Sequence, residues 1–291
     1  MSDKIILKAS EYQAELIERM NGVLMYASQL KQANSNLASL IDQSVGSFSL
    51  EKVIERGLHV WLDRHCRAIT KLYQGDTKET ITRSDLEKEL RELPRSLITA
   101  IQWNKGTDDD SSKEVANFIS KYPFELLSET FTKKAHGLFD QGLVTIAEAL
   151  LDDLGLRKYA LRNIYKISKR HISFDKRVTA ERNSWSSNYG YTTREKMARI
   201  ALNIGLAEKQ LGSYGLKPAF DALNAAMQES VIESGVTFGN KNNIECRIFN
   251  SHIRISMTPD VFSGFMSFLI QHKKDDTDVH LPLFDLTEAF A

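Results

Sequence analysis

Proline, cysteine and excess charge are all scarce in this sequence. Its five prolines never stand side by side, which excludes the Asn/Asp-Pro-Pro-aromatic motif of amino-methyltransferases. Two cysteines, Cys66 and Cys246, are too few for a secreted disulfide scaffold, so we predict free thiols in a reducing cytoplasm. Lys plus Arg number 38, as do Asp plus Glu. Any nucleic-acid contact must therefore come from a local patch, because proteins that bind polyanions with their whole surface are usually basic.

Long apolar runs are also missing. No stretch reaches the roughly eighteen apolar residues that a membrane-spanning helix needs. The first residues, MSDKIILKASEYQ, contain no apolar signal core. Hydrophobic residues nevertheless make up 42% of the chain, enough for a sizeable core. We therefore predict a cytoplasmic globular protein with no membrane partner.

The usual motifs of catalysis are absent as well. The sequence contains no G-x-G-x-x-G or G-x-x-x-x-G-K phosphate loop and no G-x-S-x-G nucleophile elbow. His59 and Cys66 share a face of one predicted helix with His65 nearby, but no second pair completes a zinc site, so helix packing is the preferred interpretation. Glu245 and His252 could form an acid/base pair, although ordinary exposed strand positions are the preferred interpretation. We predict no catalytic residue, no metal and no cofactor.

Apolar residues at spacings of three and four predict helices through most of the first 233 residues. A capping box at Ser84 and Glu87 predicts the start of a short helix. The stretch 105–113 has no apolar residue and predicts an exposed loop and a domain boundary. Gly137, Gly142 and Gly155 are expected to interrupt the helices after this loop. The expected helices are 10–41, 49–75, one from 84 that ends before Pro94, one ending near 103, 112–122, 123–136, 140–153, 156–170, 193–211 and about 218–233.

The pattern changes after residue 235. Apolar and polar residues alternate in 244–249 and 252–257, and with 236–238 these segments predict strands. Asn250 and Ser251 fit a tight hairpin turn, and Thr258 before Pro259 predicts a helix that ends near Lys273. The expected fold is mainly α with a small C-terminal β-hairpin or three-stranded antiparallel sheet. The expected regions are a helical hairpin region 1–104, a domain 112–273 and a flexible tail 274–291.

Charge is most uneven between residues 157 and 182, where nine cations accompany two acids. Phosphates need cations, and unpaired bases need flat rings on which to stack. A helix over 156–170 would place Arg162, Lys166, Lys169 and Arg170 on one face. A solvated basic face, balanced by Asp108–Asp110 or by Asp152 and Asp153, is the alternative. The predicted DNA or RNA contacts are Arg162, Lys166, Lys169, Arg170, Lys176, Arg177, Arg182, Trp185 and Tyr189.

The tail contains a second candidate binding segment, His280-Leu281-Pro282-Leu283-Phe284. It resembles the Gln-Leu-Ser/Asp-Leu-Phe motif with which bacterial proteins bind the DNA-polymerase sliding clamp. Leu283 and Phe284 would fill an apolar pocket, and Leu281 would pack beside it. His280 stands where the motif has Gln, so the hydrogen bond at the pocket rim is in question. The alternative is that this segment covers the protein's own core.

Two stretches, Phe131–Leu150 and Glu245–Met257, resemble an uncharacterised domain of plasmid and prophage proteins that often lies beside a DNA adenine-methyltransferase module. Phe139, Gly142 and Leu143 resemble its central helix pair, and Phe249, Asn250 and His252 resemble its closing hairpin. The resemblance implies a mobile genetic element and no enzymatic activity. The leading hypothesis is a non-enzymatic, nucleic-acid-associated or partner-binding protein in replication, DNA modification or host-defence interference. A nuclease or transferase with a scattered active site and a structural homo-oligomer remain the alternatives.

Overall fold

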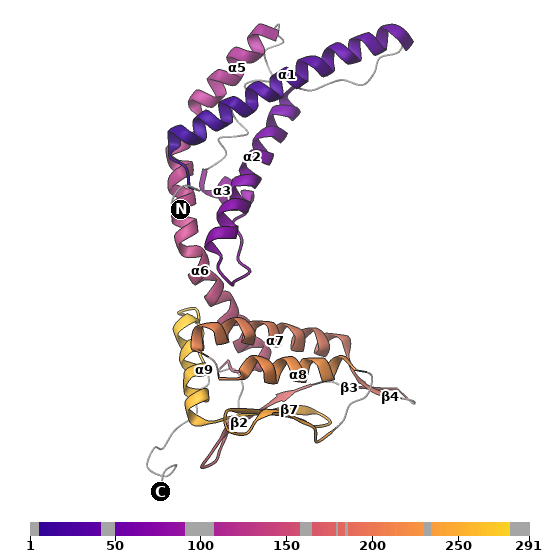
Figure 1. Cartoon of the computed structure of the whole chain (residues 1–291), viewed down its shortest axis with the longest axis vertical. Helices are drawn as coiled ribbons and strands as arrows, with labels where there is room; N and C mark the ends of the chain where they lie inside the picture. Colours follow the sequence, from indigo (N-terminus) through magenta and orange to yellow (C-terminus); the bar gives the residue numbers. More distant parts are fainter. Residues whose placement is uncertain are drawn as a thin grey trace. The chain divides into compact units, whose positions relative to one another are not determined.

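The structure is a computed structural model, and it describes residues 6–41, 50–90, 108–157, 165–178, 180–183, 186–212, 214–229 and 234–279 (Figure 1). The fold is mainly α-helical with an antiparallel sheet toward the C-terminus, which confirms the predicted class. Two compact units divide the chain, 1–139 and 140–291. This division falls later in the chain than the expected boundary at 105–111. No helix in the described ranges is long and apolar enough to cross a membrane.

In its described residues, the first unit contains helices and no strand. Helix α2 ends at a turn in which Gly75 has a φ of +57°, as the sequence indicated. A Cβ at this position would lie 2.7 Å from the ring of Phe139, so the turn needs glycine for space as well as for conformation. The helices are α1 (Ala9–Ile41), α2 (Leu50–Tyr73), α3 (Arg83–Leu90), α5 (Asp108–Lys121) and the first part of α6 (Phe124–Leu154).

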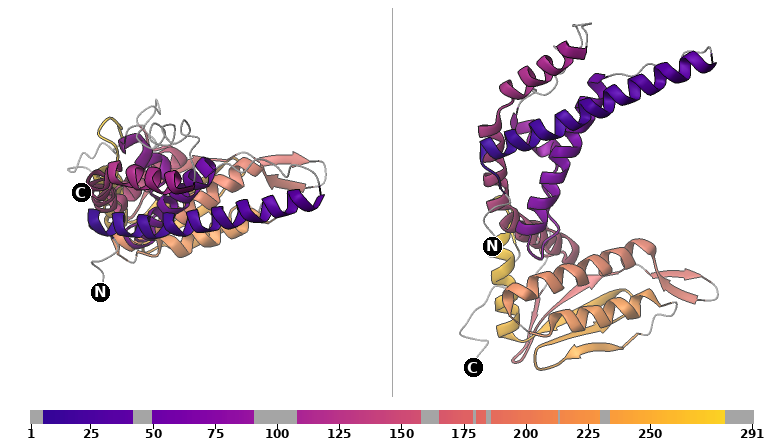
Figure 2. Two further views of the ribbon diagram at one scale, coloured as in Figure 1. Left: turned by 90° about the horizontal axis from the view of Figure 1, so that it is seen from above. Right: turned by 45° about the horizontal axis from the view of Figure 1, so that its top comes forward.

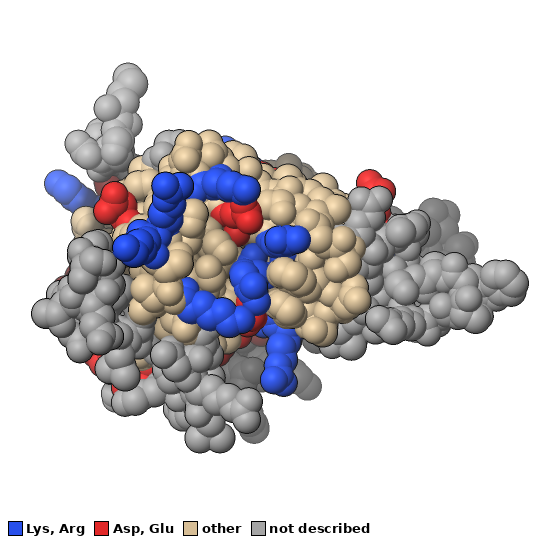
Figure 3. Space-filling model, turned by 90° about the horizontal axis from the view of Figure 1, so that it is seen from below, with Lys and Arg blue, Asp and Glu red and all other residues tan. Residues whose placement is uncertain are grey.

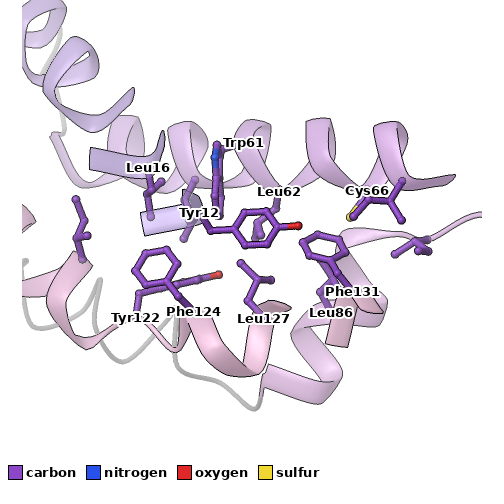
Figure 4. Packing of buried hydrophobic residues seen from close by; sticks show 14 of the residues in the cluster. Tyr12, Leu16, Trp61, Leu62, Cys66, Leu86, Tyr122, Phe124, Leu127 and Phe131 are labelled. Atoms are coloured by element: carbon purple, nitrogen blue, oxygen red, sulfur yellow. The ribbon is translucent and has the colours of Figure 1, made fainter. Parts of the chain in front are cut away.

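Aromatic rings from different helices meet in the core of the first unit (Figure 4). Tyr12 of α1 packs edge-on against Trp61 of α2, with ring centroids 5.9 Å apart. The same tyrosine stacks on Phe131 of α6 at 5.7 Å. His65 lies 5.0 Å from Tyr12 and 4.9 Å from Trp61. Three helices that are distant in sequence thus share one cluster, because each contributes a ring from its apolar stripe.

Three local predictions about helices α3, α5 and α6 are wrong. The capping box of α3 joins Thr82 to Asp85, whose backbone N–H donates to the Thr82 hydroxyl at 3.3 Å while Thr82 N–H donates to Oδ2 at 3.0 Å. Helix α5 begins at Asp108, inside the expected loop, where acidic residues favour a helix N-terminus. Helix α6 continues through Gly137 and Gly142, because its apolar stripe persists on both sides of them.

The second unit packs helices on one face of a five-stranded antiparallel sheet, ordered β1-β2-β7-β6-β5 (Figure 2). The three strands predicted after residue 235, the tight turn and the helix start at Thr258 and Pro259 are confirmed. After the end of α6 its elements are β1 (Tyr165–Ile167), β2 (Ile172–Arg177), β3 (Ala180–Asn183), β4 (Ser186–Tyr189), α7 (Tyr191–Leu211), α8 (Leu216–Gln228), β5 (Thr237–Asn240), β6 (Ile244–Ile248), β7 (His252–Met257) and α9 (Pro259–His272).

The helix expected over 156–170 is wrong in its described part. Residues 165–167 form β1, which pairs with β2, and β2 pairs in turn with β7. Tyr165 is buried against Phe262 of α9, with ring centroids 5.4 Å apart, and against Phe174 at 6.1 Å. These partners are distant in the chain or lie beyond the turn, so contacts outside the segment override its helical spacing.

The tail expected to be flexible begins with ordered residues. Lys274 N–H donates to Glu148 Oε1 at 2.9 Å, and the Thr277 hydroxyl donates to Oε2 at 3.1 Å. Val279 forms an antiparallel bridge with Arg157, which also pairs with Glu148 at 2.7 Å. The expected flexibility is therefore corrected for residues 274–279. The clamp-like segment His280–Phe284 lies outside the described residues.

Candidate functional site

One face of the five-stranded sheet carries polar side chains and has no helix packed on it in the described part of the second unit. Alternation along the strands turns Ile172, Phe174, Ile253 and Ile255 toward the helices, where they are buried. Their neighbours point the other way and are partly or fully exposed. Figure 3 views the unit from this side and shows Lys and Arg side chains gathered over it. This open face consists of Lys166, Ser173, Asp175, Arg177, Glu245, Arg247, Phe249, His252, Arg254 and Ser256.

Two arginines lie directly opposite each other at the centre of the open face. Arg247 of β6 is in register with Arg254 of β7. Their guanidinium carbons lie over the ring of Phe249, at 5.3 and 5.1 Å from its centroid. Like charges on directly opposed strand residues destabilise a sheet, so this pair costs folding free energy. The ring offsets part of that cost through its negative face.

Asp175 compensates one member of the pair. It accepts hydrogen bonds from Arg254 Nε at 2.8 Å and Nη2 at 3.1 Å, and from Lys166 Nζ at 3.1 Å. The hydrogen bonds from Arg254 are the main reason that the pKa of Asp175 lies below its usual value, and Lys166 adds to the effect. Within the described residues, no carboxylate forms an ion pair with Arg247. Arg247 is exposed and free to meet an external anion.

Two flat rings close one end of the open face. Phe249 and His252 stack with centroids 4.5 Å apart and planes at 10°. They are the closing residues of the tight turn, in which Phe249 N–H donates to His252 O at 2.9 Å. Both side chains are half-buried, and His252 Nε2 lies 3.9 Å from Asp175. Rings and guanidinium groups therefore share one surface, the combination that contacts both bases and phosphates.

The structure brings four of the predicted nucleic-acid residues to this region. Lys166 lies on β1, Arg177 ends β2, and Lys169 and Arg170 occupy the exposed turn between the two strands. The predicted helical face formed by Arg162, Lys166, Lys169 and Arg170 is wrong, because these described lysines and Arg170 belong to a hairpin.

Other predicted residues do not join the open face. Lys176 alternates to the covered side of β2, and the side chain of Tyr189 is only 1% exposed. A buried ring cannot stack on a base, so Tyr189 is corrected as a contact. Arg162 and Trp185 lie outside the described residues, and Arg182 belongs to β3.

Sequence reasoning missed the centre of the open face. Arg247 and Arg254 were not singled out. Phe249 and His252 were named only for the family resemblance and, in the case of His252, as part of an acid/base pair. A signal was nevertheless available, because Arg247 and Arg254 are equidistant from the predicted turn at Asn250 and Ser251. Positions placed symmetrically about a two-residue turn face each other across the hairpin.

Other residues of chemical interest are structural in this fold. Burial raises the pKa of the Cys66 and Cys246 thiols to about 12. Among the described residues, no group of three or more His, Cys, Asp and Glu side chains is placed to hold a metal ion.

Comparison with protein-family models, curated proteins and solved structures finds no match to this chain.

Proposed function

We propose that the second unit binds nucleic acid with unpaired bases on its open face, as a non-enzymatic binding protein. The observation that carries the proposal is the opposed pair Arg247 and Arg254. A protein that needed only to fold would gain by placing unlike charges at this register. Keeping two cations there is explained if an anionic ligand supplies the missing charge.

The chemistry of the surrounding residues supports a nucleic acid over a simple anion. Lys166, Lys169, Arg170 and Arg177 extend the positive surface along β1 and β2, so it can follow a backbone of successive phosphates. Phe249 and His252 offer a flat stack at its edge, and every unpaired base has a face suited to such a stack. A role in replication, DNA modification or host-defence interference belongs to the same proposal, through the resemblance to plasmid and prophage proteins.

Fluorescence anisotropy with labelled oligonucleotides at several salt concentrations tests the proposal. Single-stranded DNA, single-stranded RNA and duplex DNA would be compared. Replacing Arg247 and Arg254 by Ala should lower affinity for single strands about tenfold or more and reduce the salt slope by about 1.4, because each single-strand phosphate contact adds about 0.7. The wild-type protein should bind single strands more tightly than duplex.

A matched control removes the same charge elsewhere. Arg67 and Lys71 are exposed on α2 in the first unit, and replacing both by Ala should leave affinity and salt slope unchanged. Asp175→Asn should act in the opposite direction, because it removes the carboxylate that competes for Arg254. Equal loss of binding in the control and the Arg247/Arg254 variant, or no binding by the wild type, would refute the proposal.

A further inference from the structure

A cavity of about 230 Å³ lies between the end of β2 and the first turns of α7. Three cationic side chains line it, Lys176 and Arg177 from β2 and Lys196 from α7. Thr192 and Thr193, also in its wall, carry hydroxyl groups at the start of the helix. No carboxylate lines the cavity among the described residues, so the charged groups in its wall are all cations.

Lys176 places a charged group in a partly buried position without an ion pair to any described residue, which folding alone does not explain. Its side chain is half-buried on the covered side of the sheet. Burial lowers the pKa of its ammonium group, and Lys196 and Arg199 lower it further. Asp153 is the acid that opposes this effect, but both of its carboxylate oxygens accept hydrogen bonds from Arg199, at 2.6 Å from Nε and at a shorter distance from Nη2. In the described structure no carboxylate forms an ion pair with Lys176.

The start of α7 adds to the positive character of the cavity. Gly190 is the N-cap residue and has no side chain to accept a hydrogen bond from the first turn. A helix of 21 residues therefore begins at the cavity with its first N–H groups uncapped by a side chain. The partial positive charge of a helix N-terminus favours an anion at this place.

We propose that this cavity binds a phosphate group, either inorganic phosphate or the terminal phosphate of a nucleic-acid strand. The ammonium groups of Lys176 and Lys196 and the hydroxyl group of Thr192 donate hydrogen bonds to its oxygens. Arg177 lines the cavity and also ends the row of cations on the open face. A strand bound on the open face can therefore place its terminal phosphate in the cavity, whereas free phosphate needs only the cavity.

Thermal unfolding in inorganic phosphate, compared with chloride at matched ionic strength, tests the site in the full-length protein. Phosphate should raise the Tm of the wild type with a saturating concentration dependence, because a ligand of the native state stabilises it. Lys176→Met should lose this effect and, without phosphate, should melt no lower than the wild type, because it removes a half-buried charge that no carboxylate compensates. Lys217→Met, on α8, should keep the effect.

Exposed Lys196 provides a second variant, Lys196→Gln, which should weaken the phosphate effect without unfolding the protein. Oligonucleotides with a 5′- or 3′-phosphate are compared with unphosphorylated strands. This comparison shows whether the ligand is the terminal phosphate of a strand or free inorganic phosphate. Tighter binding of a phosphorylated strand by about tenfold, lost in Lys176→Met, assigns the site to strand ends. Equal affinity with retained thermal stabilisation assigns it to free phosphate.

The phosphate site fails if the wild type gains no stability in phosphate, or if Lys176→Met and Lys196→Gln keep the full gain. This outcome is distinct from failure of the open face, because Arg247→Ala with Arg254→Ala should leave the response to inorganic phosphate unchanged.

Discussion

Both units bury an apolar core, but they differ in how some of their cations are paired. In the first unit, Arg83 lies 3.1 Å from Glu87, and Arg64 lies 3.7 Å from Glu15. In the second unit, Arg247 and Lys176 have no such partner among the described residues. Under the proposed function, the two units differ in unmatched charge at the binding surface more than in the amount of charge they contain.

The largest expected effect comes from a charge placed in the core of the second unit. Ile255 of β7 is 1% exposed and faces the helices. Ile255→Asp should cost about 4 kcal/mol or more, because a buried carboxylate would have no partner. Hydrogen exchange should show loss of protection throughout residues 165–272.

The same measurement on Ile255→Val provides the control, with an expected cost of about 1 kcal/mol. Residues 9–81 of the first unit should keep their protection in Ile255→Asp if the two cores are separate. Loss of protection in both units would show that the cores unfold together and would break the comparison.

A somewhat smaller loss of stability is expected from a substitution in the aromatic cluster of the first unit. Trp61→Ala removes a fully buried ring that contacts Tyr12 and His65, and should cost about 3–5 kcal/mol in the free energy of unfolding. Denaturant titration followed by circular dichroism measures the loss.

Trp61→Phe should cost less than half as much. It keeps a ring in the cluster, and the Nε1–H that it removes has no hydrogen-bond partner among the described residues. Equal losses in the two variants would contradict the packing of Figure 4.

The smallest expected effect is a difference between the two units in how their stability depends on pH. Desolvation lowers the pKa of His65 below the ordinary value of about 6.5, although Glu15 Oε2 lies 3.3 Å away and acts in the opposite direction. The unfolded state then binds a proton first, so this contribution to the stability of the first unit is present above about pH 6.5 and is lost as pH falls. Thermal melts from about pH 7 to pH 5 should show this decline, and His65→Gln should flatten it.

Asp175 contributes to the stability of the second unit over a different pH range. Because its pKa is lowered, its stabilising contribution is present above the ordinary value of about 3.9 and is lost only as pH falls below it. The second unit should therefore show no matching decline above about pH 5 from this group. A decline in both units that His65→Gln does not change would contradict the assignment.

The sequence predicted those parts of the fold whose causes are local. The apolar stripes of α1 and α2, the alternation of β6 and β7 and the Thr258-Pro259 helix start depend on residues close together in the chain. Strands β1 and β2 were missed because β2 is stabilised by pairing with β7, almost eighty residues away along the chain. The start of α5 was missed because its first residues are polar, and polarity alone does not distinguish a loop from a helix end.

The candidate site was half predicted for the same reason. Lys166, Lys169, Arg170 and Arg177 stood out as a run of charge in one segment. Arg247 and Arg254 belong to another segment and become part of the site only through the register of β2, β7 and β6. The pairing with Asp175 is likewise a tertiary contact, which no count of charges along the chain can provide.

Each unit also contains a single described cysteine, buried at its centre: Cys66 at 2% exposure and Cys246 at 0%. With a pKa near 12, each thiol is almost wholly protonated at neutral pH and so reacts slowly with alkylating reagents. Modification must then wait for the surrounding core to open. The alkylation rate of Cys66 therefore reports how often the helical unit opens, and the alkylation rate of Cys246 reports how often the sheet opens.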